Sequence, residues 1–168
     1  MNIFPGKEEK KKEQLVEEAI LKKYNSFYRL AYSYVHRESD AEDIVQSTAY
    51  HALRAAKDLR NPEYVETWIY RILMNEIFKV LKQKDNYSYE EYIEKNGNEG
   101  EYVEDTYEDV DLIRIIDKLP EKDKLVVELR YFEDKKLEEI ALILEEKVST
   151  VKSRLYRSLK KMRIMLEE

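Results

Sequence analysis

The chain has 168 residues, of which 39% are charged, and a formal net charge of -6. It contains no cysteine, which excludes disulfides, thiolate zinc sites and intrinsic thiol redox chemistry. No apolar run approaches the roughly 20 residues that span a bilayer, and the N-terminus, MNIFPGKEEKKKEQ, lacks the apolar segment of a secretory signal. We therefore expect a cytoplasmic protein without direct membrane insertion. With three glycines, three prolines and no strand-like run between turn signals, the composition predicts an all-α fold.

Charge divides the chain into three parts. Residues 1–84 hold 15 basic and 13 acidic side chains, a net charge of +2, and residues 112–168 hold 14 and 12, again a net +2. Residues 85–111 hold 1 basic and 11 acidic side chains, a net charge of -10. Like charge at this density opposes compaction and favours an extended segment. We predict two small helical domains, 1–84 and 112–168, joined by an acidic flexible linker over 85–111.

The first domain is predicted to open with an amphipathic helix over residues 12–36. Its apolar side comprises Val16, Ala19, Ile20, Phe27, Leu30, Ala31 and Tyr34. The sequence Ser39-Asp40-Ala41-Glu42 has the pattern of a capping box and predicts the start of a second helix. Its packing face comprises Ile44, Val45, Thr48, Ala49, Ala52, Leu53 and Ala56. The acids Asp40, Glu42 and Asp43 lie in its first turn, where the helix dipole is a sufficient explanation for them, and a docking role needs further evidence.

A third helix is predicted over residues 65–84, after a short loop marked by Asn61-Pro62. Its core stripe comprises Val65, Trp68, Ile69, Ile72, Leu73 and Val80. The opposite side carries Tyr70, Met74 and Phe78 beside Arg71, Asn75 and Lys82. Aromatic rings next to cations suit single-stranded nucleic acid, because bases offer π faces and the backbone offers phosphates. A central helix that is buried on all sides would show the same pattern.

The segment 147–163, KVSTVKSRLYRSLKKMR, carries seven basic residues and no acidic one. In a helix it forms an apolar stripe of Val148, Val151, Leu155, Leu159 and Met162, opposite Ser149, Ser153, Tyr156, Arg157 and Lys160. A shorter apolar pattern precedes it, made of Leu137, Ile140, Ala141 and Leu144. Two helices separated by Glu145, Glu146 and Lys147 predict a helix-turn-helix that binds nucleic acid, although Glu145 stands where glycine is often found. A basic helix whose cations only solvate its outer face is the alternative.

Three motifs in this order resemble a known family: DAEDIVQ at residues 40–46, TWIYRILMN at 67–75, and the whole of 119–163. They are similar to regions 2 and 4 of bacterial RNA polymerase sigma factors, and the two-domain length indicates the extracytoplasmic-function (ECF) group. The resemblance implies a dissociable subunit that binds core RNA polymerase, recognises the -10 and -35 promoter elements and helps to open the DNA.

The resemblance also assigns candidate residues to three surfaces. The segment that binds the clamp helices of the largest polymerase subunit corresponds to Asp40, Glu42, Asp43, Ile44 and Gln46. The -10 contacts come from the specificity loop over residues 60–66 and from the third helix: Arg60, Asn61, Glu63, Tyr64, Trp68, Tyr70, Arg71, Met74 and Asn75. The -35 contacts come from the basic helix: Ser149, Thr150, Lys152, Ser153, Arg154, Tyr156, Arg157 and Lys160, with Arg154 assigned a partly structural role.

Other partners follow from the resemblance alone. They are the flap of the second-largest polymerase subunit, bound by the second domain, and an anti-sigma factor that occludes the polymerase-binding faces. A stand-alone helix-turn-helix transcription regulator is the alternative function, and an interaction protein that binds only protein is a third. Catalysis is disfavoured, because the histidines, His36 and His51, lack metal-site spacing and no Gly-rich phosphate loop or nucleophile elbow is present. We predict no cofactor and no metal.

Overall fold

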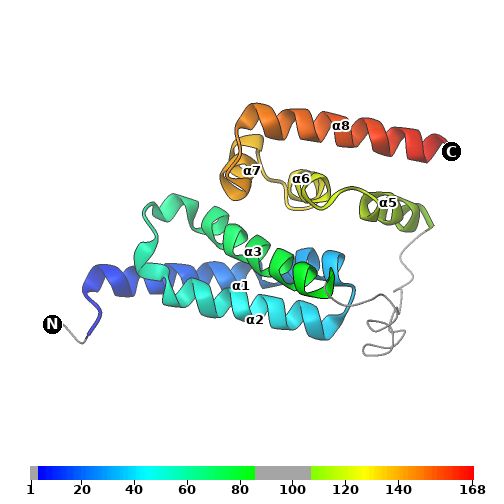
Figure 1. Cartoon of the computed structure of the whole chain (residues 1–168). Helices are drawn as coiled ribbons and strands as arrows, with labels where there is room; N and C mark the ends of the chain where they lie inside the picture. The colour runs from blue at the N-terminus through cyan, green and yellow to red at the C-terminus, as the bar shows by residue number, and fades with distance from the viewer. Residues whose placement is uncertain (1–3, 86–106) are drawn as a thin grey trace. The chain divides into compact units, whose positions relative to one another are not determined.

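A computed structural model describes residues 4–85 and 107–168, and the chain divides into two compact units, Met1–Gly100 and Glu101–Glu168 (Figure 1). Every regular element in these described ranges is a helix, which confirms the all-α prediction. Most of the expected linker, 86–106, lies outside the described residues. The linker was expected to reach residue 111, but the helix α5 (Tyr107–Asp117) already begins at Tyr107.

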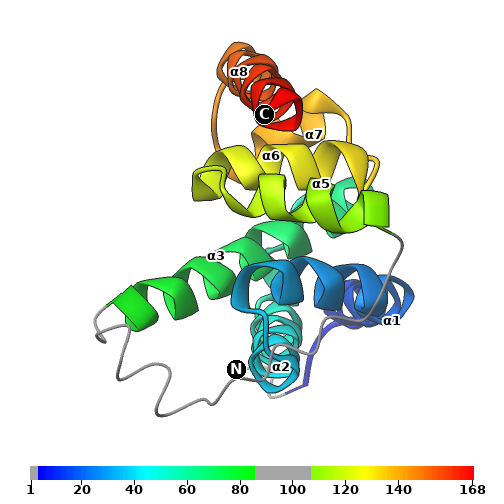
Figure 2. The same cartoon turned by 90° about the vertical axis from the view of Figure 1, so that its right-hand side faces the viewer.

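Three long helices build the first unit: α1 (Lys7–Val35), α2 (Glu38–Arg54) and α3 (Val65–Asp85). Two short 3-10 helices, η1 (Ala56–Asp58) and η2 (Pro62–Tyr64), connect α2 to α3. The helices α1 and α2 run antiparallel, and α3 packs against both of them (Figures 1 and 2). The chain reverses between α1 and α2 at His36, whose left-handed backbone (φ 54°) lets its N–H bond to the carbonyl of Tyr32 at 2.8 Å.

The core of this unit is a stack of side chains from all three helices. The fully or almost fully buried members are Val16, Phe27, Leu30 and Ala31 of α1, Ile44, Val45 and Ala52 of α2, and Ile69, Tyr70, Leu73 and Ile77 of α3. The predicted apolar side of α1 is confirmed, since all seven of its residues are buried. On α2 the prediction for Leu53 is wrong, because Ala52 and Ala56 take the inward positions and leave Leu53 40% exposed. The buried hydroxyl of Thr48 donates to the carbonyl of Ile44 at 2.8 Å and so leaves no unpaired donor.

The predicted capping box at the start of α2 is wrong. The helix begins at Glu38, with Arg37 as an extended N-cap residue that makes no capping hydrogen bond through its side chain. Ser39 therefore lies inside the first turn, because the left-handed residue at His36 already completes the reversal and the helix follows directly. The loop before α3 does carry a side-chain cap, since Oδ1 of Asn61 accepts the N–H of Glu63 at 3.1 Å.

The second unit contains α5, α6 (Glu121–Tyr131), α7 (Leu137–Leu144) and α8 (Val148–Glu167). Its buried apolar side chains include Leu125 and Leu129 of α6, Ile140 and Ile143 of α7, and Val151, Leu155 and Met162 of α8. The predicted stripe of α8 is thus largely correct. Two of its five residues are exceptions: Leu159 is half-buried, and Val148, the first residue of the helix, is 41% exposed.

The turn between α7 and α8 consists of the three residues predicted for it, Glu145 to Lys147. Glu145 adopts the left-handed conformation (φ 54°), and its N–H bonds to the carbonyl of Ala141. A residue other than glycine therefore closes α7 in the way that glycine usually does. The helix-turn-helix geometry is retained, at the cost of backbone strain at Glu145.

Candidate nucleic-acid and protein interfaces

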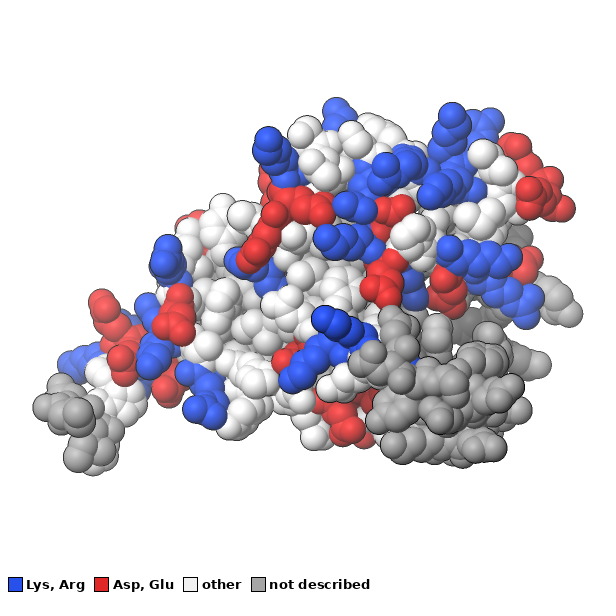
Figure 3. All heavy atoms as spheres, in the orientation of Figure 1, with Lys and Arg blue, Asp and Glu red and all other residues white. Residues whose placement is uncertain are grey.

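The outer side of α8 is a continuous polar and cationic surface. Ser149, Thr150, Lys152, Ser153, Tyr156, Arg157 and Lys160 are all exposed, and Figure 3 shows Lys and Arg side chains spaced along this helix. The ammonium group of Lys152 lies 5.9 Å from the ring centroid of Tyr156, which is a cation–π distance. A cationic helix with hydroxyls and one aromatic ring, held by a three-residue turn, has the chemistry that the major groove of DNA requires.

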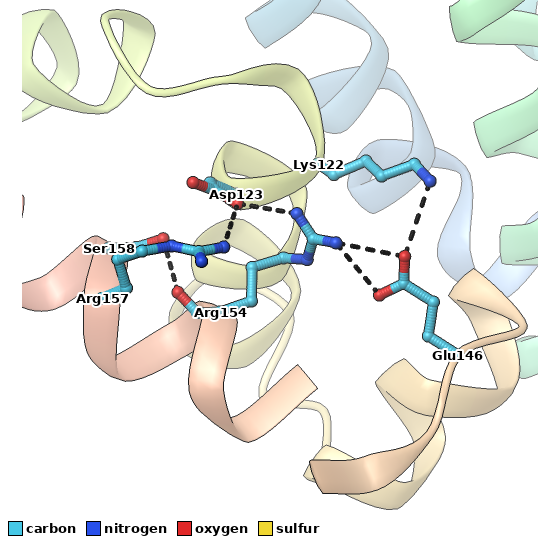
Figure 4. A network of polar contacts seen from close by, with 6 residues as sticks. All are labelled: Lys122, Asp123, Glu146, Arg154, Arg157 and Ser158. Atoms are coloured by element: carbon cyan, nitrogen blue, oxygen red, sulfur yellow. Dashed lines mark hydrogen bonds and ion pairs between the residues drawn. The ribbon is translucent and has the colours of Figure 1, made fainter. Parts of the chain in front are cut away.

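Arg154 differs from the other candidate residues of α8, because its side chain points into the unit. One terminal nitrogen, Nη1, lies 2.9 Å from Oδ1 of Asp123 on α6, and the other, Nη2, lies 3.2 Å from Oε1 of Glu146 in the turn (Figure 4). The side chain is only 19% exposed. The structural part of its predicted role is therefore supported by two ion pairs, whereas a direct contact with DNA is not.

The buried face of α3 corrects part of the -10 prediction. The ring of Tyr70 is fully buried and meets the ring of Phe27 edge-on, with centroids 5.0 Å apart and planes at 83°. Phe78 is half-buried and meets Tyr34 in the same way at 6.0 Å. Base stacking by Tyr70 is therefore wrong, because α3 packs against both α1 and α2 and its buried arc is shifted toward Tyr70. The predicted stripe is correspondingly wrong in part, since Trp68, Ile72 and Val80 are only half-buried. Packing against α1 and α2 explains both rings, but α3 is not buried on all sides, since Asn75 and Lys79 are exposed.

The remaining -10 candidates lie on or beside the less buried side of α3. Arg60, Asn61, Glu63, Tyr64 and Asn75 are exposed, and Trp68, Arg71 and Met74 are half-buried. At 100° per residue, Trp68, Arg71 and Asn75 fall on one face of α3, and Tyr64 precedes that face by one turn. The rings beside Arg71 and Asn75 are therefore those of Tyr64 and of Trp68, which periodicity assigned to the core stripe, and not that of Tyr70.

The acidic segment of α2 is partly available to a partner. Glu42, Asp43 and Gln46 are exposed. The carboxylate of Asp40 lies 3.2 Å from the ammonium group of Lys84 near the end of α3, so it already has a partner within the unit. Ile44 is 3% exposed and belongs to the core, so its predicted direct contact with polymerase is wrong.

Sequence reasoning missed a partly exposed apolar side of α1, which reaches the start of α2 at Tyr28. Leu21 and Tyr24 are 72% and 41% exposed, and Tyr28 follows one turn later with its ring stacked on that of Tyr32 at 6.1 Å. Burial raises the pKa of Tyr28, and the negative charges of Glu38 and Glu42 raise it further, which places Tyr28 beside the start of α2. The signal was the spacing of residues 21, 24 and 28, which form a second apolar stripe beside the core stripe.

Comparison with known proteins agrees with this division of the chain. Residues 13–87 match the family model of Sigma-70 region 2, and residues 109–162 match that of Sigma-70, region 4. The RNA polymerase sigma factor SigV of Bacillus subtilis (strain 168) is 46% identical over 141 residues, which cover 83% of this chain and 84% of SigV. The ECF RNA polymerase sigma factor SigW of the same strain is 30% identical over 160 residues, covering 86% of this chain and 84% of SigW.

A solved structure shares the fold. The sigma factor RpoE of Bartonella quintana, in complex with the anti-sigma factor NepR, superposes with a TM-score of 0.70 at 19% identity, over 90% of this chain and 96% of that chain. Two helical units that match regions 2 and 4 define a sigma-70-type transcription initiation factor. The chain belongs to the ECF group of RNA polymerase sigma factors, so it is an alternative sigma factor, and the stand-alone regulator is not favoured. No helix in the described part of the chain is both long and apolar enough to cross a membrane.

Proposed function

We propose that this sigma factor binds core RNA polymerase through α2, contacts the -10 element through the loop before α3 and α3 itself, and contacts the -35 element through α8. The observation that carries the proposal is the exposed cationic side of α8 within an intact helix-turn-helix. A helix that only solvated its surface would not need a fixed turn and a fixed partner helix behind it.

Each exposed residue of α8 suits a separate task in the major groove. Arg157 and Lys152 are donors that match the N7 and O6 acceptors of guanine, and Lys160 reaches the phosphates as a point charge. Ser153 donates or accepts, and the ring of Tyr156 contacts a thymine methyl group. The hydroxyls of Ser149 and Thr150 lie at the N-terminus of α8, where the free N–H groups of the helix favour phosphate.

The -10 element is contacted as a single strand. Tyr64, 46% exposed, and Trp68 one turn along offer ring faces to unstacked bases. Arg60 and Arg71 supply positive charge on either side of them, and the side chain of Asn75 supplies a donor and an acceptor for a base edge. Asn61 and Glu63 are held by the cap of η2, which fixes the path of the loop.

The protein partners are core polymerase and an anti-sigma factor. The carboxylates of Glu42 and Asp43 and the amide of Gln46 form the polar part of the docking surface for the clamp helices, and Leu21 and Tyr24 of α1 extend it with apolar area. RpoE of Bartonella quintana was solved with an anti-sigma factor. An inhibitor of this kind is proposed to cover the same surface on this chain and thereby exclude polymerase.

The experiment separates core binding from promoter binding. The double variant Asp43→Ala/Gln46→Ala is expected to lose co-elution with core polymerase in size exclusion. The double variant Lys152→Ala/Lys160→Ala is expected to retain core binding and to lose -35-dependent binding of a promoter duplex by the holoenzyme, with the salt slope reduced by about 1 for each lost phosphate contact.

Arg163→Ala is the matched control for the cationic helix. Arg163 is an exposed cation of α8, but its Nε already lies 3.4 Å from the carboxylate of Glu167, and this variant is expected to behave like the wild type. If the chain shifts duplex DNA but neither binds core polymerase nor redirects it, the proposal fails and a stand-alone regulator is the better interpretation.

A further inference from the structure

Asp123 is a buried carboxylate behind α8 that the proposed promoter contacts do not include. It lies in the first turn of α6, and its side chain is 4% exposed. Its Oδ1 atom lies 2.9 Å from Nη1 of Arg154 and 3.8 Å from Nη2 of Arg157, so two arginines of α8 share one carboxylate (Figure 4). A carboxylate this deeply buried cannot accept a hydrogen bond from a base, so any effect on DNA must pass through these arginines.

The first of these arginines fixes the recognition helix. Nη2 of Arg154 lies 3.2 and 3.4 Å from the two carboxylate oxygens of Glu146, and the ammonium group of Lys122 lies 3.5 Å from the same carboxylate. The hydroxyl of Ser158 donates to the carbonyl of Arg154 at 2.8 Å. Figure 4 shows how this network joins α6, the turn and α8. Through Arg154, the carboxylates of Asp123 and Glu146 therefore tie α8 to α6 and to the turn.

The second arginine, Arg157, is placed differently. Its side chain is 58% exposed, and its contact with Asp123 involves one terminal nitrogen. A guanidinium group has five N–H donors in a rigid fork, and bidentate recognition of guanine uses two of them. At 3.8 Å this contact is an ion pair without a hydrogen bond, so it leaves all the donors of Arg157 for a base and biases the direction in which the fork points. A long side chain that is restrained before binding loses less conformational entropy on binding.

We propose that Asp123 is a positioning residue for -35 recognition: its negative charge orients the guanidinium group of Arg157 toward the base edge. The inference rests on the proposed function of α8. It assigns the specificity at one base pair to a pair of residues, Arg157 in the groove and Asp123 behind it. Neighbouring contacts of α8, such as those of Lys152, do not depend on Asp123.

The test is the variant Asp123→Asn in holoenzyme with core polymerase, on duplexes in which each -35 base pair is replaced in turn. Asparagine keeps the size and an Oδ1 acceptor for Arg154, but it removes the charge that attracts Arg157. We expect binding of the preferred -35 element to weaken about two- to tenfold. Discrimination should fall at the base pair whose recognition Arg157→Ala also relaxes, and it should persist at the other base pairs.

A double-mutant cycle distinguishes positioning from a general structural effect. In the Arg157→Ala background, Asp123→Asn is expected to change the affinity by less than about twofold, because the residue through which it acts is gone. Glu146→Gln loosens Arg154 from the turn but leaves the Asp123–Arg157 contact in place. This variant is expected to lower the melting temperature of the second unit, whereas its discrimination at each -35 base pair should equal that of the wild type.

Asp134→Asn is the matched control for charge. Asp134 is an exposed acid of the same unit with a left-handed backbone (φ 53°) that asparagine also tolerates, so this variant removes one negative charge and leaves the network intact. The inference is overturned if Asp123→Asn lowers discrimination equally at every -35 base pair. It is also overturned if Asp123→Asn lowers the affinity by the same factor in the Arg157→Ala background as in the wild type. A wild-type holoenzyme without any -35 dependence would instead contradict the proposed function itself.

Discussion

Replacing Tyr70 by alanine is expected to destabilise the first unit and not to remove a base contact. The ring is fully buried, and its edge-on partner is Phe27 at 5.0 Å. Truncation of a buried aromatic side chain costs about 3–5 kcal/mol, from lost apolar transfer and from the cavity that remains, and the aromatic pair accounts for about 0.5–1.5 kcal/mol of it. Because whole domains are stable by only about 5–15 kcal/mol, this loss is a large fraction of the total.

The measurement is urea unfolding followed by the fluorescence of Trp68, the only tryptophan of the chain, which lies in the same helix. Tyr64→Ala is the control: that ring is 46% exposed, and its removal is expected to change the free energy of unfolding by no more than about 0.5 kcal/mol while it weakens -10 binding. The opposite pattern, a Tyr70→Ala variant as stable as the wild type but defective with the -10 strand, would refute the assignment of Tyr70 to the core.

Two further predictions concern the backbone and pH. Glu145→Gly is expected to stabilise the second unit by about 1 kcal/mol, because glycine removes the strain of the left-handed residue (φ 54°). Denaturant unfolding measures this gain, and the control Glu145→Ala should not show it. Equal gains for the two variants would contradict the strain argument. The pKa of Tyr28 is raised above its ordinary value of 10.0, by burial first and then by Glu38 and Glu42, so the proton is bound more tightly in the folded state. The stability that Tyr28 contributes is therefore fully present below pH 10.0 and is lost as the pH rises through the raised pKa. The free energy of unfolding, measured at a series of alkaline pH values, should fall less steeply with pH for Tyr28→Phe than for the wild type. Parallel curves for the two proteins would rule this out.

Periodicity in the sequence was enough to locate the long helices. The apolar side of α1 and most of the stripe of α8 are buried as predicted, because each of these helices has one dominant covered face. The start of α1 was placed five residues late, at residue 12 instead of Lys7. Its first turns consist mostly of Lys and Glu, which have good helix propensity but contain no apolar residue to mark them.

Periodicity failed where burial depends on more than one neighbour. It shows which residues of α3 share a face, but not that two helices cover the arc that includes Tyr70. The network behind α8 was equally invisible, because Asp123 and Arg154 are 31 positions apart and nothing in the local pattern pairs them. Only the resemblance to region 4 predicted a partly structural role for Arg154. The structure identifies its two partners as Asp123 and Glu146.

Run-off transcription with purified core polymerase from a related bacterium, on a library of promoter fragments, tests the central claim most directly. With the wild-type chain we predict new transcripts whose start sites share two upstream elements at a fixed spacing. The variant Lys152→Ala/Lys160→Ala should reduce transcription from these promoters while core binding persists. If the chain binds core polymerase but the transcripts match those of core polymerase alone, or if it does not bind core polymerase at all, the assignment of promoter recognition to this chain is wrong.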